Sequence, residues 1–194
     1  MLERKGIVTF KGNPVTLVGN EVKAGDKAPD FTALKTDLSE LKLSDYKGRV
    51  VILTSFPSVD TSVCALQAKR FNEEAGKLKD DVSVITISVD LPFALGRFCA
   101  AEGIENEVTV SDHRDLDFGY KYGYMFKDHE IPWKFEFYSD ISAASTEALS
   151  NKQTRSNTLA MFGQAIASIK ELNLDRDSNF ILLTKTGGCD DEEA

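Results

Sequence analysis

The stretch VVILTSFPSVDTSVCALQAKRF, residues 50–71, combines the patterns of a strand, a loop and the start of a helix. It begins with VVILTSF, which is nearly all apolar or β-branched, as is typical of a strand covered on both faces. Apolar side chains then recur at steps of three and four from Cys64 to Leu78, which predicts one face of a helix. Asp60 or Thr61 is the expected N-cap. The segment therefore predicts a central parallel strand that leads into a helix with a cysteine in its first turn.

Strands and helices continue to alternate on both sides of this segment. The sequence predicts a strand at VSVITISVD (82–90), a helix at PFALGRFCAAEG (92–103) with proline in its first turn, and a strand at EVTVSD (107–112). Near the N-terminus, GNPVTLVG (12–19) predicts a β-hairpin. Strand, helix and strand in alternation indicate βαβ units, and hence an α/β fold with three layers.

The pattern is less regular after residue 123. WKFEFYSD (133–140) alternates as a strand does, residues 143–172 are rich in alanine with apolar side chains at helical spacing, and NFILLTKT (179–186) predicts a further strand. The terminal GGCDDEEA (187–194) predicts a disordered acidic tail.

Length and composition predict one domain over residues 1–186, with residues 124–186 as its divergent C-terminal part. The chain has 194 residues, of which 42% are hydrophobic, so it can bury a sizeable core. Its formal net charge of −8 argues against nucleic-acid binding. No apolar run is long enough to span a bilayer, and no apolar segment of a signal peptide follows the initial MLERKG. We therefore expect a cytoplasmic protein that does not bind membranes.

The cysteines predict redox chemistry more readily than a metal or cofactor site. Three cysteines, odd in number and widely spaced, do not resemble the disulfide framework of a small secreted domain. The chain has no paired cysteines of the zinc-binding kind and only two histidines, His113 and His129. It also lacks the glycine patterns of nucleotide-binding loops. We expect no metal and no cofactor.

Cys64 has the position of a reactive thiol. The unpaired amides at a helix N-terminus favour the thiolate. Lowering the pKa of a thiol from about 8.5 to about 6 raises its thiolate fraction at pH 7 roughly thirtyfold. The same change weakens the thiolate as a nucleophile roughly tenfold, so the net gain in reaction rate is only about threefold. The site must therefore also orient its substrate. Thr61 lies three residues before Cys64, so its hydroxyl can lie beside the sulfur, and Pro57 can shield the approach.

Motifs between residues 8 and 123 resemble those of a known family. FKGNPVTLVG, GDKAPDF, FPSVDTSVC, ISVDLPFALGRFCAAEG and SDHRDLDFGYKYG are similar to segments of the thiol peroxidases, the atypical two-cysteine branch of the peroxiredoxins. The resemblance implies a thioredoxin-like fold in which peroxide oxidises Cys64 to a sulfenic acid. It also implies that Cys99 resolves this acid to an intramolecular disulfide, which thioredoxin reduces. It implies further that no metal, haem or flavin takes part, and we expect a homodimer.

The resemblance also directs attention to Lys134. In the family, a strand beginning roughly A-R-S-V-F-V-I-D supplies an arginine that lies against the peroxidatic sulfur and the peroxide. The nearest stretch here is WKFEFYSD, which places Lys134 at that position. Lysine keeps the charge but lacks the planar fork that can hold two atoms at once. Two alternatives to a peroxidase therefore stay open: a thiol–disulfide exchanger or redox sensor, and a catalytically silent interaction scaffold.

Three other side chains have simpler interpretations. Cys99 lies on an apolar helix, so structural burial is the alternative to a resolving role. Cys189 lies among acidic residues that would repel a thiolate, which indicates an incidental exposed thiol. His113 follows a strand in the sequence SDHRD and is expected to form a hydrogen bond in a loop rather than act as a base.

A sulfenic acid condenses readily with a nearby thiol, which prevents irreversible oxidation. A disulfide requires its Cα atoms to lie within about 7 Å of each other. Cys64 and Cys99 are predicted to lie on separate helices. If they start farther apart than this, the catalytic cycle must include local unfolding of one helix.

Overall fold

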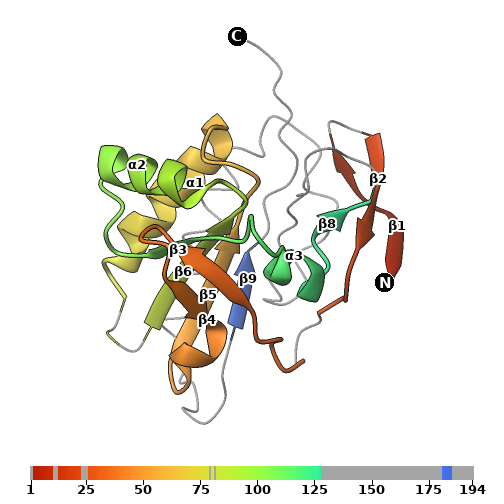
Figure 1. Cartoon of the computed structure of the whole chain (residues 1–194), viewed down its shortest axis with the longest axis horizontal. Helices are drawn as coiled ribbons and strands as arrows, with labels where there is room; N and C mark the ends of the chain where they lie inside the picture. The colour runs from red at the N-terminus through yellow and green to blue at the C-terminus, as the bar shows by residue number, and fades with distance from the viewer. Residues whose placement is uncertain are drawn as a thin grey trace.

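A computed structural model describes residues 2–10, 13–22, 26–78, 80, 82–127 and 181–184. The predicted N-terminal hairpin is present: β1 (Glu3–Phe10) and β2 (Asn13–Val18) pair in antiparallel fashion. A two-residue strand, β8 (Met125–Phe126), joins β2 on its other side. Figure 1 shows this small sheet to one side of the main sheet. The sequence did not predict β8, because two residues carry no detectable alternation.

The main sheet has six strands, and the predicted strand β5 (Val50–Ser55) lies inside it, between β6 and β9. Its order is β4-β3-β7-β6-β5-β9, where β5 pairs in parallel with β6 and β9, and β6 pairs in parallel with β7. At the other end of the sheet, β3 runs antiparallel to both of its neighbours, β7 and the edge strand β4. The bounds are β3 (Thr32–Lys35), β4 (Glu40–Lys42), β5 (Val50–Ser55), β6 (Val82–Ser88), β7 (Val108–Ser111) and β9 (Ile181–Thr184).

Two long helices cover one face of this sheet and a short helix covers the other, which gives the predicted three layers (Figure 1). α1 (Ser62–Ala75) and α2 (Pro92–Glu102) lie on the same side, whereas α3 (Asp117–Lys121) lies opposite. A 3₁₀ turn, η1 (Leu43–Tyr46), precedes β5. On the α3 side, the aromatic rings of Phe31, Phe118 and Tyr122 contact one another with centroids 4.6–5.9 Å apart. They form part of the largest hydrophobic core.

α1 ends earlier than its apolar pattern predicts. The helix stops at Ala75, where Gly76 is the C-cap and its N–H bonds to the carbonyl of Asn72. Leu78 nevertheless packs with Ile52 and the rest of a second core cluster. The apolar pattern therefore continues beyond the helix because the chain keeps contact with the same core.

Several predicted elements lie outside the described residues. These are the strand at 133–140, the helix at 143–172 and the acidic tail at 187–194, so the predicted domain bounds remain a prediction. The strand predicted at 179–186 contains β9. None of the helices in the described part of the chain is both long and apolar enough to cross a membrane.

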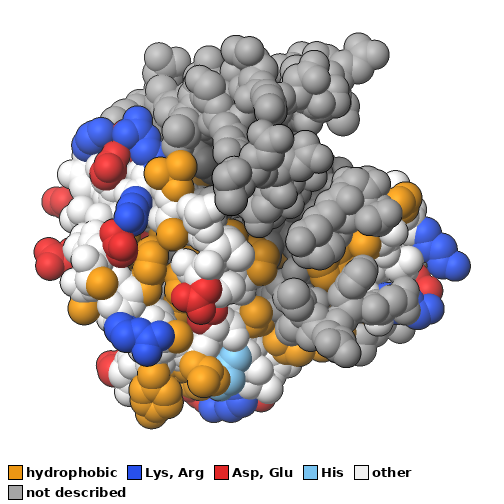
Figure 2. Space-filling model, turned by 90° about the horizontal axis from the view of Figure 1, so that it is seen from above, with side chains coloured by type: hydrophobic (Ala, Val, Ile, Leu, Met, Phe, Trp, Pro, Cys, Tyr) orange, Lys and Arg blue, Asp and Glu red, His pale blue; other side chains and the backbone are white. Residues whose placement is uncertain are grey.

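On the face seen in Figure 2, basic, acidic and apolar side chains of the described residues are interspersed. Leu91 and Phe93, at the start of α2, are among the exposed apolar side chains.

Candidate active site

α1 begins at the predicted position, and Thr61 rather than Asp60 is its N-cap. The Thr61 hydroxyl oxygen accepts a hydrogen bond from the backbone N–H of Cys64 at 3.3 Å. The same hydroxyl donates to the carbonyl of Ser58 at 3.3 Å. Cys64 therefore lies in the first turn of α1, where the helix dipole and the unpaired amides favour negative charge.

The loop before α1 is held by Asp90, which the sequence analysis did not identify. The Asp90 carboxylate accepts hydrogen bonds from Ser58 Oγ at 2.7 Å, from the N–H of Val59 at 2.9 Å and from Ser88 Oγ at 2.9 Å. Ser111 Oγ donates to the Asp90 carbonyl. Because β5 and β6 are parallel, the loops after both strands meet at one edge of the sheet. An acidic residue just after a buried strand was the signal that could have revealed this contact.

Cys64 faces the interior from this edge. Its side chain is 1% exposed and belongs to the main core cluster with Phe56 and Val59. Pro57 follows Phe56 directly and is half-buried in the same loop. The structure therefore places the predicted Pro57, Thr61 and Cys64 in one short segment whose backbone is fixed from both ends. Because the sulfur is buried, only a small substrate fits this setting without a large rearrangement.

Asp112 directly follows β7, at the same edge of the sheet. Its carboxylate accepts hydrogen bonds from the N–H groups of Phe118 at 3.1 Å and Gly119 at 2.9 Å, at the start of α3. Burial raises the pKa of Asp112 to about 6, although these two donors oppose the rise. Asp112 thus fixes α3 beneath the core that surrounds Cys64. His113, the next residue, bonds through Nδ1 to Ser111 Oγ at 2.9 Å, as expected for a hydrogen-bonding loop histidine.

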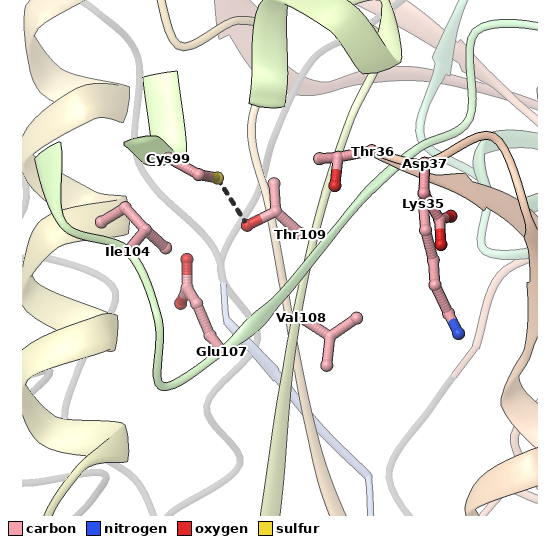
Figure 3. A pocket seen from close by; sticks show the side chains of 8 residues that line it. All are labelled: Lys35, Thr36, Asp37, Cys99, Ile104, Glu107, Val108 and Thr109. Carbon is pink, nitrogen blue, oxygen red and sulfur yellow. Dashed lines mark hydrogen bonds between the residues drawn. The ribbon is translucent and has the colours of Figure 1, made fainter. Parts of the chain in front are cut away.

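Cys99 lies in a separate pocket on the inner side of α2 (Figure 3). Its thiol is partly buried and donates a hydrogen bond to the hydroxyl of Thr109 at 3.4 Å. Burial raises the pKa of Cys99 above its usual value, and Glu107 adds to this rise, while the bond to Thr109 opposes it. In the described structure Cys64 and Cys99 are both thiols, not joined in a disulfide.

Side-chain contacts tie the end of α2 to α1. Asn72 on α1 donates to the carbonyl of Gly103, which ends α2 in the left-handed conformation at φ 67°. The same Asn72 side chain accepts from the N–H groups of Glu105 at 2.9 Å and Asn106 at 2.7 Å. The segment that follows Cys99 is therefore anchored to the helix that carries Cys64.

The remaining predicted site residue, Lys134, lies outside the described residues, as does Cys189. Within the part of the chain that the structure describes, no group of three or more His, Cys, Asp or Glu side chains is placed to hold a metal ion.

Comparisons with known proteins identify the family. Residues 23–131 match the Redoxin family model. A thiol peroxidase from Listeria monocytogenes is 59% identical over 121 residues, which cover 62% of this chain and 73% of the relative. The chain belongs to the thiol peroxidase family of the redoxins. A thiol peroxidase from Bacillus subtilis is 58% identical over 121 residues, covering 62% of this chain and 72% of the relative.

A solved structure agrees with this family assignment. A peroxiredoxin-like protein from Aquifex aeolicus is 40% identical, with a TM-score of 0.61 over 67% of this chain and 74% of that chain. The expected thioredoxin-like α/β fold and the family resemblance are therefore confirmed. Thiol peroxidases are peroxiredoxin enzymes, and the three residues Pro57, Thr61 and Cys64 lie within the matched range.

Proposed function

We propose that this chain is a thiol-dependent peroxidase that reduces hydrogen peroxide and small organic hydroperoxides through Cys64. The observation that carries the proposal is the position of Cys64 in the first turn of α1, capped by Thr61 in a loop that Asp90 fixes. The Cys64 thiolate attacks the terminal peroxide oxygen. An S–O bond forms, the O–O bond breaks, and the leaving oxygen takes a proton to become water or an alcohol. Cys64 is left as a sulfenic acid.

Thr61 and Pro57 are proposed to position the peroxide. The Thr61 hydroxyl donates to Ser58 and accepts from the Cys64 N–H, which leaves one lone pair of its oxygen for another donor. A hydroperoxide O–H can donate to that lone pair while its terminal oxygen faces the sulfur. Pro57 has no N–H that could compete for this bond.

Cys99 is proposed to resolve the sulfenic acid. Its sulfur attacks Cys64 Sγ, the S–S bond forms, the S–O bond breaks, and the thiol proton leaves with the hydroxide as water. Cys99 is bound to Thr109, and Asn72 anchors the chain beyond it, so we propose that α2 opens locally before the two sulfurs meet. A reduced thioredoxin then restores both thiols by thiol–disulfide exchange. We also propose that the chain is located in the cytoplasm and that it forms a homodimer.

A coupled assay tests this function. The chain, thioredoxin, thioredoxin reductase and NADPH are mixed with hydrogen peroxide or cumene hydroperoxide, and NADPH oxidation is followed. We expect sustained oxidation that needs both the peroxide and thioredoxin. Disulfide formation with a weak oxidant but no sustained peroxide consumption would support a thiol–disulfide exchanger instead. If neither reaction occurs, the result would support a silent scaffold.

Lys134 is proposed as the cation that stabilises the Cys64 thiolate. Lys134→Arg should then raise the second-order rate constant with peroxide, because a guanidinium fork can orient the peroxide whereas an ammonium only attracts it. Lys134→Met should raise the pKa of Cys64 and slow the reaction. Stopped-flow measurements across pH compare the three proteins. Identical rates and thiol titrations would place Lys134 away from the site.

Asp90 is proposed to position the loop on which the peroxide binds. Asp90→Ala removes two hydrogen bonds to that loop and one to Ser88 of β6, so the rate constant with peroxide should fall on the order of tenfold to a hundredfold. Asp60→Ala is the matched control, since Asp60 is an exposed acid in the same loop. Stopped-flow rates with each variant provide the measurement. Equal rates for both variants would show that the loop keeps its shape without Asp90.

A further inference from the structure

Glu107 is a buried acid that the proposed peroxidase mechanism does not use. Its side chain is 8% exposed, and neither carboxylate oxygen has a hydrogen-bond partner among the described residues. The Thr86 hydroxyl on β6 is close enough to lower the pKa of Glu107, although the two groups do not meet the geometry of a hydrogen bond. Burial dominates and raises the pKa of Glu107 to about 8. An unpartnered buried carboxyl is costly, which calls for an explanation.

Glu107 and Cys99 line the same pocket. Figure 3 shows the Glu107 carboxylate and the Cys99 sulfur on the same side of the pocket, with Thr109 beside both. The pocket has a volume of about 260 Å³. Thr109 pairs directly with Thr86 across the β6–β7 ladder, so the polar groups beneath α2 come from neighbouring positions of two strands. The negative charge of Glu107 raises the pKa of Cys99 beyond the effect of burial.

The other charged groups near this pocket do not neutralise Glu107. Lys35 and Asp37, from β3 and the turn after it, line the pocket beyond Val108, and the Lys35 ammonium points away from the carboxylate in Figure 3. No ion pair joins Lys35 to Glu107 in the described part of the chain. Lys69 of α1 and Glu102 of α2 pair with each other. Cys99 is therefore the titratable group that most directly shares the environment of Glu107.

We propose that Glu107 is a positioning residue for the resolving step: it holds Cys99 as a neutral thiol against Thr109 and thereby sets the pH range in which Cys99 attacks the Cys64 sulfenic acid. This inference rests on the proposed role of Cys99. Above about pH 8, where Glu107 is ionised, a thiolate beside its carboxylate would bury two like charges in one pocket, so Cys99 stays protonated to higher pH while α2 is closed. A protonated thiol reacts poorly with peroxide, which confines oxidation to Cys64.

The pH dependence of the Cys99 reactions follows from the order in which Glu107 and Cys99 lose their protons. Glu107 ionises near pH 8, before Cys99, so the Cys99 thiol must lose its proton next to an existing negative charge. Glu107→Gln keeps the size of the side chain but never carries a charge. The ionisation of Cys99 in the closed state should then shift to lower pH, and the rate of attack on the sulfenic acid should level off at lower pH as well.

Alkylation of Cys99 tests this directly, without any peroxide chemistry. In the full chain with Cys64→Ser and Cys189→Ser, Cys99 is the one remaining cysteine. The iodoacetamide rate is measured from pH 6 to pH 11 in this parent, with Glu107→Gln, and with Glu105→Gln, an exposed acid two residues away. The midpoint of interest is the pH at which the alkylation rate reaches half of its maximum. We expect it to fall by about one pH unit in Glu107→Gln and to stay the same in Glu105→Gln. An unchanged midpoint in Glu107→Gln would overturn the proposal.

Glu107→Asp separates charge from packing. It disturbs the pocket at least as much as glutamine does but keeps the carboxylate, so its midpoint should stay near that of the parent. If Asp and Gln lower the midpoint alike, the effect is one of packing and the proposal is wrong.

A second measurement follows disulfide formation in the chain with Cys64 intact, after one equivalent of peroxide, across the same pH range. The rate should reach its plateau at lower pH in Glu107→Gln than in Glu105→Gln. Glu107→Gln could lower the pH midpoint of alkylation and yet leave the pH dependence of disulfide formation unchanged. That result would overturn the role of Glu107 in resolution. If no variant forms the disulfide, the proposed role of Cys99 fails, whereas the alkylation result still decides how Glu107 acts on Cys99.

Discussion

Cys64→Ser is expected to abolish peroxide turnover, a loss of at least about a thousandfold in rate. A serine hydroxyl stays protonated at neutral pH even at a helix N-terminus, and its oxygen cannot form the sulfenic acid on which the cycle depends. Of the described cysteines, Cys64 alone lies in the first turn of a helix next to a threonine hydroxyl. The coupled assay with thioredoxin and NADPH measures the loss.

Cys189→Ser is the matched control, because it removes a thiol from the acidic C-terminal sequence and should leave turnover intact. Turnover in Cys64→Ser equal to that of the unaltered chain would contradict the assignment of the nucleophile.

The second large effect is expected in Cys99→Ser. This variant should consume about one equivalent of peroxide at the normal rate and then stall, because the sulfenic acid at Cys64 has no thiol to attack it. Further peroxide should convert it to the sulfinic acid, which thioredoxin cannot reduce. Intact-mass measurements should show one added oxygen atom, then two. If Cys99→Ser cycles normally with thioredoxin, Cys99 is a structural thiol.

The site on α1 could be predicted from sequence because its determinants are local. A run of β-branched residues specifies β5, helical spacing specifies α1, and a threonine three residues before Cys64 supplies the cap. The choice between Asp60 and Thr61 could not be made from the pattern, because both are good N-caps. The hydrogen bond from the Cys64 N–H to the Thr61 hydroxyl decides it.

Contacts between distant segments could not be predicted in this way. Asp90 holds a loop some thirty residues earlier in the chain, and this depends on β5 and β6 ending at the same edge of the sheet. Glu107 violates the rule that acids lie at the surface, so its burial beneath α2 is visible only in the fold. The short elements β4, β8 and α3 are too brief for periodicity to reveal.

Lys134 marks the limit of the family resemblance. Its proposed place depends on a strand at residues 133–140, which lie outside the described residues. The variants of Lys134 therefore test a prediction made from sequence, whereas those of Asp90 and Glu107 test contacts that the structure describes.

Peptide mapping after a single exposure to peroxide tests the central claim most directly. The reduced chain is treated with one equivalent of hydrogen peroxide, remaining thiols are blocked by alkylation, and the non-reduced digest is analysed by mass spectrometry. We predict a disulfide that joins the peptides of Cys64 and Cys99, with Cys189 recovered in alkylated form. Recovery of Cys64 as an alkylated thiol, with the peroxide consumed elsewhere or not at all, would contradict the account.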